Sequence, residues 1–171
     1  MTAPHRASEG SRDVVTLRLG DEVLAVPARS LREVLEPMQI TRVPRTDDFV
    51  RGLINVRGAV VPLADLRVPF DMPRKPADAD TRILVLELPL AGTLSVVGVI
   101  ADAVHEVTQF DLSSLEDVPA VGTRWPPHLV TAIGRWNGRF VILPDLEAIF
   151  DSYLGGADTS PPSELEHSSC D

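Results

Sequence analysis

Apolar and polar positions alternate with a period of two along most of the chain between residues 14 and 143. Such alternation is typical of β-strands that bury one face. Residues 14–19 alternate, Gly20-Asp21 provides a turn, and residues 23–26 resume the pattern, which predicts a hairpin. The same reasoning predicts further strands at 51–56, 59–64, 82–88, 94–100, 103–108, 130–136 and 139–143.

Helical periodicity is clear in one segment, residues 145–154, where the apolar positions fall on one stripe and acidic residues stand at the start. The stretch from Ser30 to Pro37 is ambiguous. Ser30 could cap a short helix, but Leu31, Glu33 and Leu35 also alternate with their neighbours as in a strand. Many short strands separated by Gly/Pro turns favour an all-β barrel or sandwich over an α/β fold.

The sequence repeats itself. Residues 23–34 align with 96–107 at an offset of 73, and residues 57–70 align with 137–150 at an offset of 80. This repeat predicts a duplicated β unit, that is, two similar small barrels that share an interface and join near 71–80. We expect a first subdomain at about 14–70 plus part of the C-terminal helix, and a second at about 81–150. The polar ends, 1–13 and 155–171, are expected to be disordered tails.

Composition narrows the function classes. The 171 residues are 44% hydrophobic and carry a formal charge of −9, which argues against nucleic acid as a partner because phosphate binding needs a basic face. The single cysteine, Cys170, supports neither a disulfide framework nor a cysteine-based metal site. No apolar run approaches the roughly 18–20 residues that span a bilayer. We therefore expect a soluble cytoplasmic protein with no direct membrane insertion.

Catalytic motifs are missing from the sequence. It contains no HExxH, no GxSxG and no glycine-rich phosphate loop, so we predict no catalytic residue, no cofactor and no metal site. His105, next to Glu106, is best interpreted as a solvent-facing strand residue. Trp125 and Trp136 could anchor an interface, although packing within a strand is the better interpretation for Trp136.

Arg57 is the one charge between residues 52 and 64, directly before Gly58. The repeat aligns this pair with Asn137-Gly138, a sequence that strongly favours a two-residue hairpin turn. Arginine is a poorer choice where a turn needs a positive φ. Two interpretations stay open: a solvated arginine on a looser turn with Gly58 in the left-handed region, or a cation retained for a partner.

The segment RVPRTDDFVRGLINVRGAVVPLADLRVPF, residues 42–70, resembles the CheW family of chemotaxis coupling proteins. The resemblance rests on the string G-x-x-N-x-R-G-x-x-x-P-x-x-D-L and extends over about 14–154. It implies an all-β fold with one or two short helices, in which two SH3-like five-stranded subdomains pack on a shared core. It also implies a non-catalytic adaptor that couples chemoreceptors to the histidine kinase CheA and that is recruited to cytoplasmic or inner-membrane receptor arrays.

Partner-binding positions also follow from the resemblance. It implies contacts with the regulatory domain of CheA, the cytoplasmic tip of chemoreceptors and other CheW-like domains in rings. The family's functional arginine corresponds to Arg57, with neighbours Asn55, Val56 and Gly58. Its functional glutamate corresponds to Glu33, with the neighbouring apolar contact at Leu31. A receptor groove is expected, by position alone, at Val26, Val34 and Val99. The alternatives are a regulatory fragment of a larger signalling protein and a small β-barrel enzyme.

Overall fold

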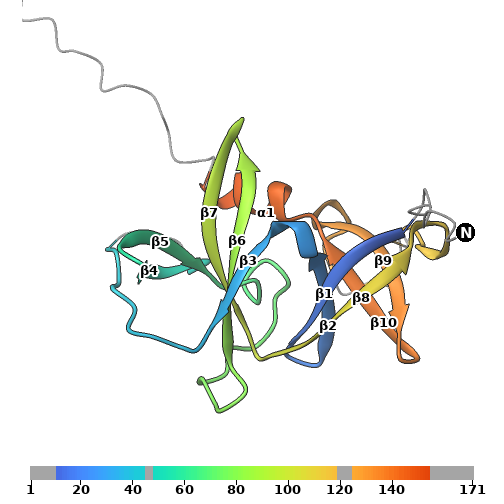
Figure 1. The fold of residues 1–171 in the computed structure, drawn as a ribbon, viewed down its shortest axis with the longest axis horizontal. Coiled ribbons are helices and arrows are strands. Elements are labelled where there is room, and N and C mark those ends of the chain that lie inside the picture. The colour runs from blue at the N-terminus through green and yellow to red at the C-terminus, as the bar shows by residue number, and fades with distance from the viewer. Residues whose placement is uncertain (1–10, 45–47, 119–124, 155–171) are drawn as a thin grey trace, which may run out of the picture.

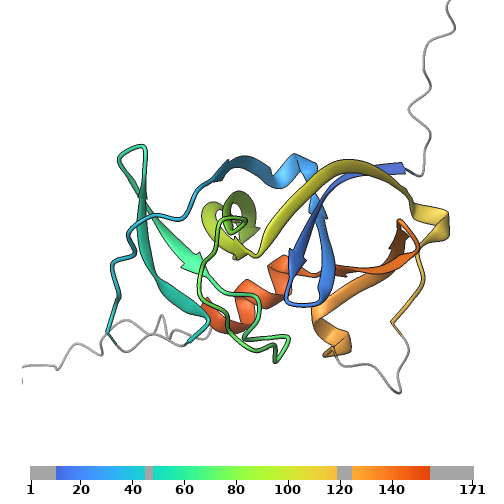
Figure 2. The same ribbon diagram turned by 90° about the horizontal axis from the view of Figure 1, so that it is seen from below.

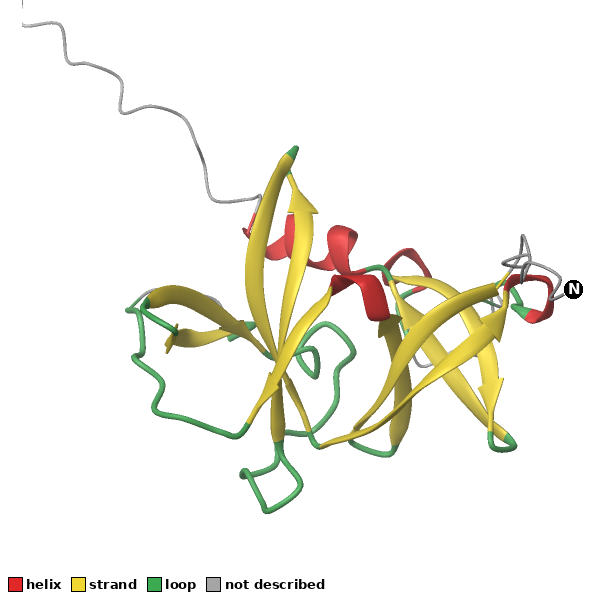
Figure 3. Cartoon of the chain, viewed as in Figure 1, coloured by secondary structure: helices red, strands yellow, loops and turns green. Residues whose placement is uncertain are grey.

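The structure is a computed structural model that describes residues 11–44, 48–118 and 125–154. Strands predominate in it, and besides one α-helix it contains three short 3-10 turns (Figure 3). The helical elements are η1 Ala28–Ser30, η2 Leu112–Ser114, η3 Pro127–Leu129 and α1 Leu146–Leu154. The strands are β1 Ser11–Leu19, β2 Glu22–Pro27, β3 Leu31–Leu35, β4 Val50–Val56, β5 Ala59–Ala64, β6 Arg82–Leu90, β7 Thr93–Ala101, β8 Ala103–Asp111, β9 Val130–Trp136 and β10 Arg139–Pro144. The predicted strands and helix are confirmed, and the ambiguous segment after Ser30 is strand β3.

The strands form two five-stranded sheets, with the orders β8-β1-β2-β10-β9 and β3-β6-β7-β5-β4. The sheets lie side by side, and α1 lies between them in two perpendicular views (Figures 1 and 2). This arrangement confirms an all-β fold of two similar five-stranded subdomains. We call the first sheet, which contains β1, sheet A, and the second, which contains β3, sheet B.

The duplication is visible in the pairing register. Sheet A becomes sheet B when β1, β2, β8, β9 and β10 are replaced by β6, β7, β3, β4 and β5. The pair Val15↔Val107 in sheet A has its equivalent in Val34↔Leu84 of sheet B, and a bulge follows at the same place in both. The two parallel pairings, β10 with β2 and β5 with β7, have the same register as well. The chain therefore consists of two repeats, β1–β5 and β6–β10, related by a pseudo-two-fold axis.

The sheets do not follow the expected division into 14–70 and 81–150. Each repeat gives two strands to one sheet and three to the other, because the chain crosses between sheets after β2 and again after β7. The repeats are contiguous in sequence, but the subdomains are exchanged. The expected N-terminal tail of 1–13 is also too long, since β1 begins at Ser11. The rest of that tail and the expected tail at 155–171 lie outside the described residues.

Buried aliphatic and aromatic side chains form one large cluster that draws on both sheets and on α1. Two smaller clusters lie within single sheets, one around Ile54 and Val85 in sheet B and one around Val14 and Phe110 in sheet A. Because each sheet also encloses apolar side chains of its own, it is strongly curled. The shared core predicted for the two subdomains is thus present.

A buried ionic cluster also joins the two sheets. Asp65, at the end of β5, accepts hydrogen bonds from Nε and Nη2 of Arg67 at 2.9 and 3.1 Å. Arg67 Nη1 lies 3.5 Å from a carboxylate oxygen of Asp102 in the crossover between β7 and β8. The other oxygen of Asp102 accepts the backbone N–H of Gly20 in the β1–β2 turn at 2.6 Å. Asp65, Arg67 and Asp102 are 0%, 2% and 6% exposed, so the contacts that link the two sheets here are made by charged side chains that are almost fully buried.

Candidate functional site

The β4–β5 hairpin turns in two residues, Arg57 and Gly58, because Val56 pairs directly with Ala59. Both turn residues have positive φ, 51° and 84°, as a type I′ turn requires. Asn55 supports the turn, since its side-chain oxygen accepts the N–H of Gly58 at 2.9 Å. The first repeat therefore keeps an arginine where the backbone favours a small residue. A residue held in a disfavoured conformation is a candidate for a functional role.

Arg57 forms an ion pair with Glu33 of β3. Arg57 Nη2 lies 2.9 Å from Glu33 Oε2, and Nε lies 3.2 Å from the same oxygen. In the strand order, β3 is at one edge of sheet B and β4 at the other, so the ion pair links opposite edges of the curled sheet. The Arg57 side chain is 82% exposed and that of Glu33 is 22% exposed. The arginine is thus held in place by its partner and still presented to solvent.

This pairing changes the titration of Glu33. The hydrogen bond from the Arg57 guanidinium, supported by the charges of Arg57 and Arg32, lowers the pKa of the Glu33 carboxyl below its ordinary value of 4.5. The stabilisation from the ion pair is therefore present at neutral pH and is lost as the pH falls through the lowered pKa.

We expect Arg57→Asn to raise the pKa of Glu33 toward its ordinary value, because the hydrogen bond and the nearest positive charge are removed. NMR titration of the Glu33 side-chain carboxyl carbon in both proteins measures this change. Asp111, whose pKa is lowered by hydrogen bonds from Ser113, is the internal control and should titrate alike in both. Equal Glu33 midpoints in the two proteins would contradict the assigned ion pair.

The second repeat has a similar link with different chemistry. Glu106 stands in the position of Glu33, and it accepts a hydrogen bond from Nε1 of Trp136 at 2.9 Å. The Trp136 ring also stacks on His105, with ring centroids 5.2 Å apart. The turn that follows Trp136 is Asn137-Gly138, with φ of 49° and 75°. Both repeats thus link opposite sheet edges through a glutamate, but only the first, with Arg57, places a cation on the turn.

Of the predicted partner-binding residues, the structure links Glu33 on β3 to the tip of the β4–β5 hairpin through its ion pair with Arg57. Asn55, Arg57 and Gly58 are exposed, whereas Val56 is 8% exposed and supports the turn from within. Leu31 is half-buried and packs against the large core cluster. That these residues bind a partner remains a prediction.

The expected receptor groove at Val26, Val34 and Val99 needs correction. Val26 and Val99 are each 1% exposed and belong to the core between the sheets, so they do not line a surface. Val34 is 40% exposed. It alternates with Glu33 along β3, so the two side chains point to opposite faces of the strand. The three valines therefore do not form one groove.

Val60 is a surface residue that the sequence reasoning missed. It pairs with Asn55 across the hairpin and is 67% exposed, next to the turn that carries Arg57. Together with Met38 and Leu53 it lines an open groove of about 490 Å³. Alternation along β5 contains the signal, because buried Val61 and Leu63 place Val60 on the outer face. The hairpin thus presents an apolar side chain beside a charged one, a combination common at protein interfaces.

Comparison with known proteins identifies the family. The protein-family model that describes the CheW-like domain matches residues 13–154 of this chain. The chain belongs to the CheW-like family. The chemotaxis protein CheW of Helicobacter pylori is 31% identical over 131 residues, which cover 77% of this chain and 76% of that protein. The chemotaxis protein CheW of Klebsiella aerogenes is 28% identical over 141 residues, 82% of each chain.

A solved structure agrees with this assignment. The crystal structure of the scaffolding protein TtCheW from Thermoanaerobacter tengcongensis matches with a TM-score of 0.75 and 30% identity, over 86% of this chain and 93% of that chain. As a member of this family, the chain has an adaptor role in chemotaxis-type signalling, and the matched structure is likewise that of a scaffolding protein. None of the helices in the described residues has the length and apolar character needed to cross a membrane.

Proposed function

We propose that this chain couples chemoreceptors to the histidine kinase CheA, and that Glu33, Arg57 and the exposed face of the β4–β5 hairpin bind one of these partners. The observation that carries the proposal is Arg57 itself. It occupies a turn position that favours asparagine or glycine, is oriented by Glu33, and leaves most of its side chain in solvent. Arginine is one of the residues most often found to carry binding energy at protein interfaces.

The coupling mechanism follows from how an adaptor acts. The regulatory domain of CheA, receptor tips and other CheW-like domains would dock on separate surfaces of one rigid body. A signal then passes only if the adaptor makes different contacts in the active and inactive states of the kinase. The buried ionic cluster and the shared core make this body stiff, which suits such a role. Recruitment to cytoplasmic or membrane-bound receptor arrays would follow from receptor binding.

We expect Arg57→Ala and Arg57→Asn to stay folded and to weaken copurification with CheA or with a receptor cytoplasmic fragment by about tenfold, as for an arginine at the centre of an interface. Arg57→Asn is the sharper variant, because the second repeat already has asparagine in this turn. It removes the cation while favouring the backbone. Circular dichroism checks the fold, and kinase stimulation in the ternary mixture checks function.

The matched control is Asn137→Ala, which changes the equivalent turn of the second repeat and leaves Arg57 untouched. It should copurify as the unmodified chain does. Unchanged binding of both partners by folded Arg57→Asn would remove Arg57 from the interface. Loss of binding in Asn137→Ala to the same extent would point to a general effect of hairpin stability.

A further inference from the structure

Two pockets occupy equivalent places in the two repeats. One, of about 90 Å³, lies at sheet B, and the other, of about 140 Å³, lies at sheet A beside the start of α1. The pairing registers relate their lining residues. Several equivalent pairs line both pockets, among them Thr81 and Arg12, Arg67 and Glu147, and Asp102 and Arg29. We call the pocket at sheet B, which is lined in part by the segment 72–79, the covered pocket, and we call the pocket at sheet A the open pocket.

The segment 72–79, which precedes β6 in the chain, lies along one side of the covered pocket. Lys75 and Ala77 line the pocket, and the Lys75 carbonyl accepts a hydrogen bond from buried Arg67 Nη1 at 3.4 Å. At the start of the segment, the N–H of Met72 donates to the carbonyl of Arg67 at 2.8 Å. At its end, the Asp78 carboxylate accepts the N–H of Asp80 at 2.8 Å, which turns the chain into β6. The segment is thus fixed at both ends.

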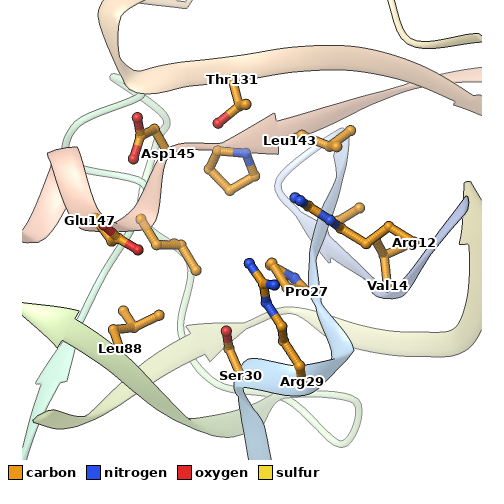
Figure 4. Close-up of a pocket in the computed structure, with 13 residues that line it drawn as sticks. Arg12, Val14, Pro27, Arg29, Ser30, Leu88, Thr131, Leu143, Asp145 and Glu147 are labelled. Atoms are coloured by element: carbon orange, nitrogen blue, oxygen red, sulfur yellow. The ribbon is translucent and has the colours of Figure 1, made fainter. Parts of the chain in front are cut away.

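Among the described residues, no segment lies across the open pocket as 72–79 lies along the covered one, and Arg12, Arg29 and Glu147 in its lining form no ion pair. Figure 4 shows the guanidinium groups of Arg12 and Arg29 directed into the pocket, with Asp145 and Glu147 on the opposite side. In the covered pocket, the equivalent residues Arg67 and Asp102 are paired with each other.

The segment equivalent to 72–79 is the one that precedes β1. Val14↔Pro27 in sheet A corresponds to Ile83↔Ile100 in sheet B, which fixes an offset of 69 between β1 and β6. At this offset, residues 3–10 (APHRASEG) align with residues 72–79 (MPRKPADA). Proline matches proline, the basic pair His5-Arg6 matches Arg74-Lys75, and Glu9 matches Asp78. Strand pairing alone sets this offset, so the chemical match is independent evidence.

The charge reversal inside the pockets fits the same occupant. Arg67 donates to the covering segment in the covered pocket, whereas Glu147 in the equivalent position can only accept. Arg6, the equivalent of Lys75, supplies a cation with five N–H donors. We propose that residues 3–10 of the same chain bind across the open pocket as residues 72–79 lie across the covered one, with Arg6 facing Glu147. This inference does not depend on the proposed partner-binding surface.

A spin label tests the proposal in the full-length chain. Cys170 is the only cysteine, so Cys170→Ser combined with His5→Cys places one nitroxide in the N-terminal segment. We expect paramagnetic broadening of the amide signals of Leu88, Thr131 and Glu147, which line the open pocket. Arg6→Glu should abolish most of this broadening, and adding Glu147→Arg to Arg6→Glu should restore it.

Two controls accompany the experiment. A label on native Cys170 should leave the same signals sharp, and broadening from that label instead would assign the pocket to the C-terminal segment and overturn the proposal. Labelled unenriched chain mixed with unlabelled ¹⁵N chain should give no broadening, because an effect there means binding between copies. Absence of broadening from the label at position 5, or broadening unaffected by Arg6→Glu, would also overturn the proposal. None of these outcomes bears on Arg57.

Discussion

Asp65→Ala is expected to lower the free energy of unfolding by about 3–5 kcal/mol, the usual result of removing one member of a buried ion pair. The carboxylate of Asp65 is fully buried and accepts two hydrogen bonds from the Arg67 side chain and one from the Arg67 backbone. Without it, the guanidinium of Arg67 keeps contacts at 3.4 and 3.5 Å with Lys75 and Asp102. A buried cation would then be poorly compensated. The midpoint and slope of urea unfolding measure the loss.

The duplication offers a matched control for this prediction. Asp145 is the equivalent of Asp65, but it accepts the N–H of Ala148 at 3.0 Å and so caps α1. Asp145→Ala should cost about 1 kcal/mol, as for an N-cap. The double variant Asp65→Ala/Arg67→Met removes both charges and should recover most of the loss. Equal destabilisation by Asp65→Ala and Asp145→Ala, or a double variant no better than the single one, would contradict the buried pair.

The strands and the duplication could be predicted from the sequence, but the division into sheets could not. Period two identifies a strand and the repeat identifies its counterpart, because both are local patterns. Sheet membership depends on where the chain crosses over. The chain crosses over at two places, at the short turn Ala28–Ser30 and at the single residue Asp102 between β7 and β8. Neither place has a sequence feature that indicates a change of sheet. A duplicated sequence is equally compatible with separate and with exchanged subdomains.

The candidate site was predicted in parts for a related reason. Arg57 and Glu33 were each expected to bind partners, but their contact links two edges of one curled sheet and is not encoded in their spacing. The groove expected from the family resemblance was also misplaced at Val26 and Val99. Position in a family motif does not show which side chains are buried, and both residues lie in strands whose two faces are buried, one against each cluster.

Gly52→Ala is the second large effect that we expect. Gly52 has a φ of 146°, and a Cβ atom added there would lie 2.4 Å from the carbonyl oxygen of Thr41. The close approach exists because Thr41 and Leu53 exchange two backbone hydrogen bonds of 2.8 Å. The variant should lose about 2–6 kcal/mol, combining about 1–3 kcal/mol for backbone strain with about 1–3 kcal/mol for overpacking. Urea unfolding measures it.

Gly92→Ala is the control for this prediction. Gly92 also has a positive φ, 77°, but a Cβ there meets nothing within 4 Å, so only strain of about 1–2 kcal/mol remains. The two variants also differ in their consequence for the site. Gly52 lies on β4, which carries Asn55 and leads into the Arg57 turn, so Gly52→Ala should displace Arg57 and raise the pKa of Glu33 toward its ordinary value. Gly92→Ala should leave that pKa lowered. Equal urea midpoints for the two variants would mean that the approach of Thr41 to β4 is not tight, and an unchanged Glu33 titration in Gly52→Ala would mean that β4 does not position Arg57.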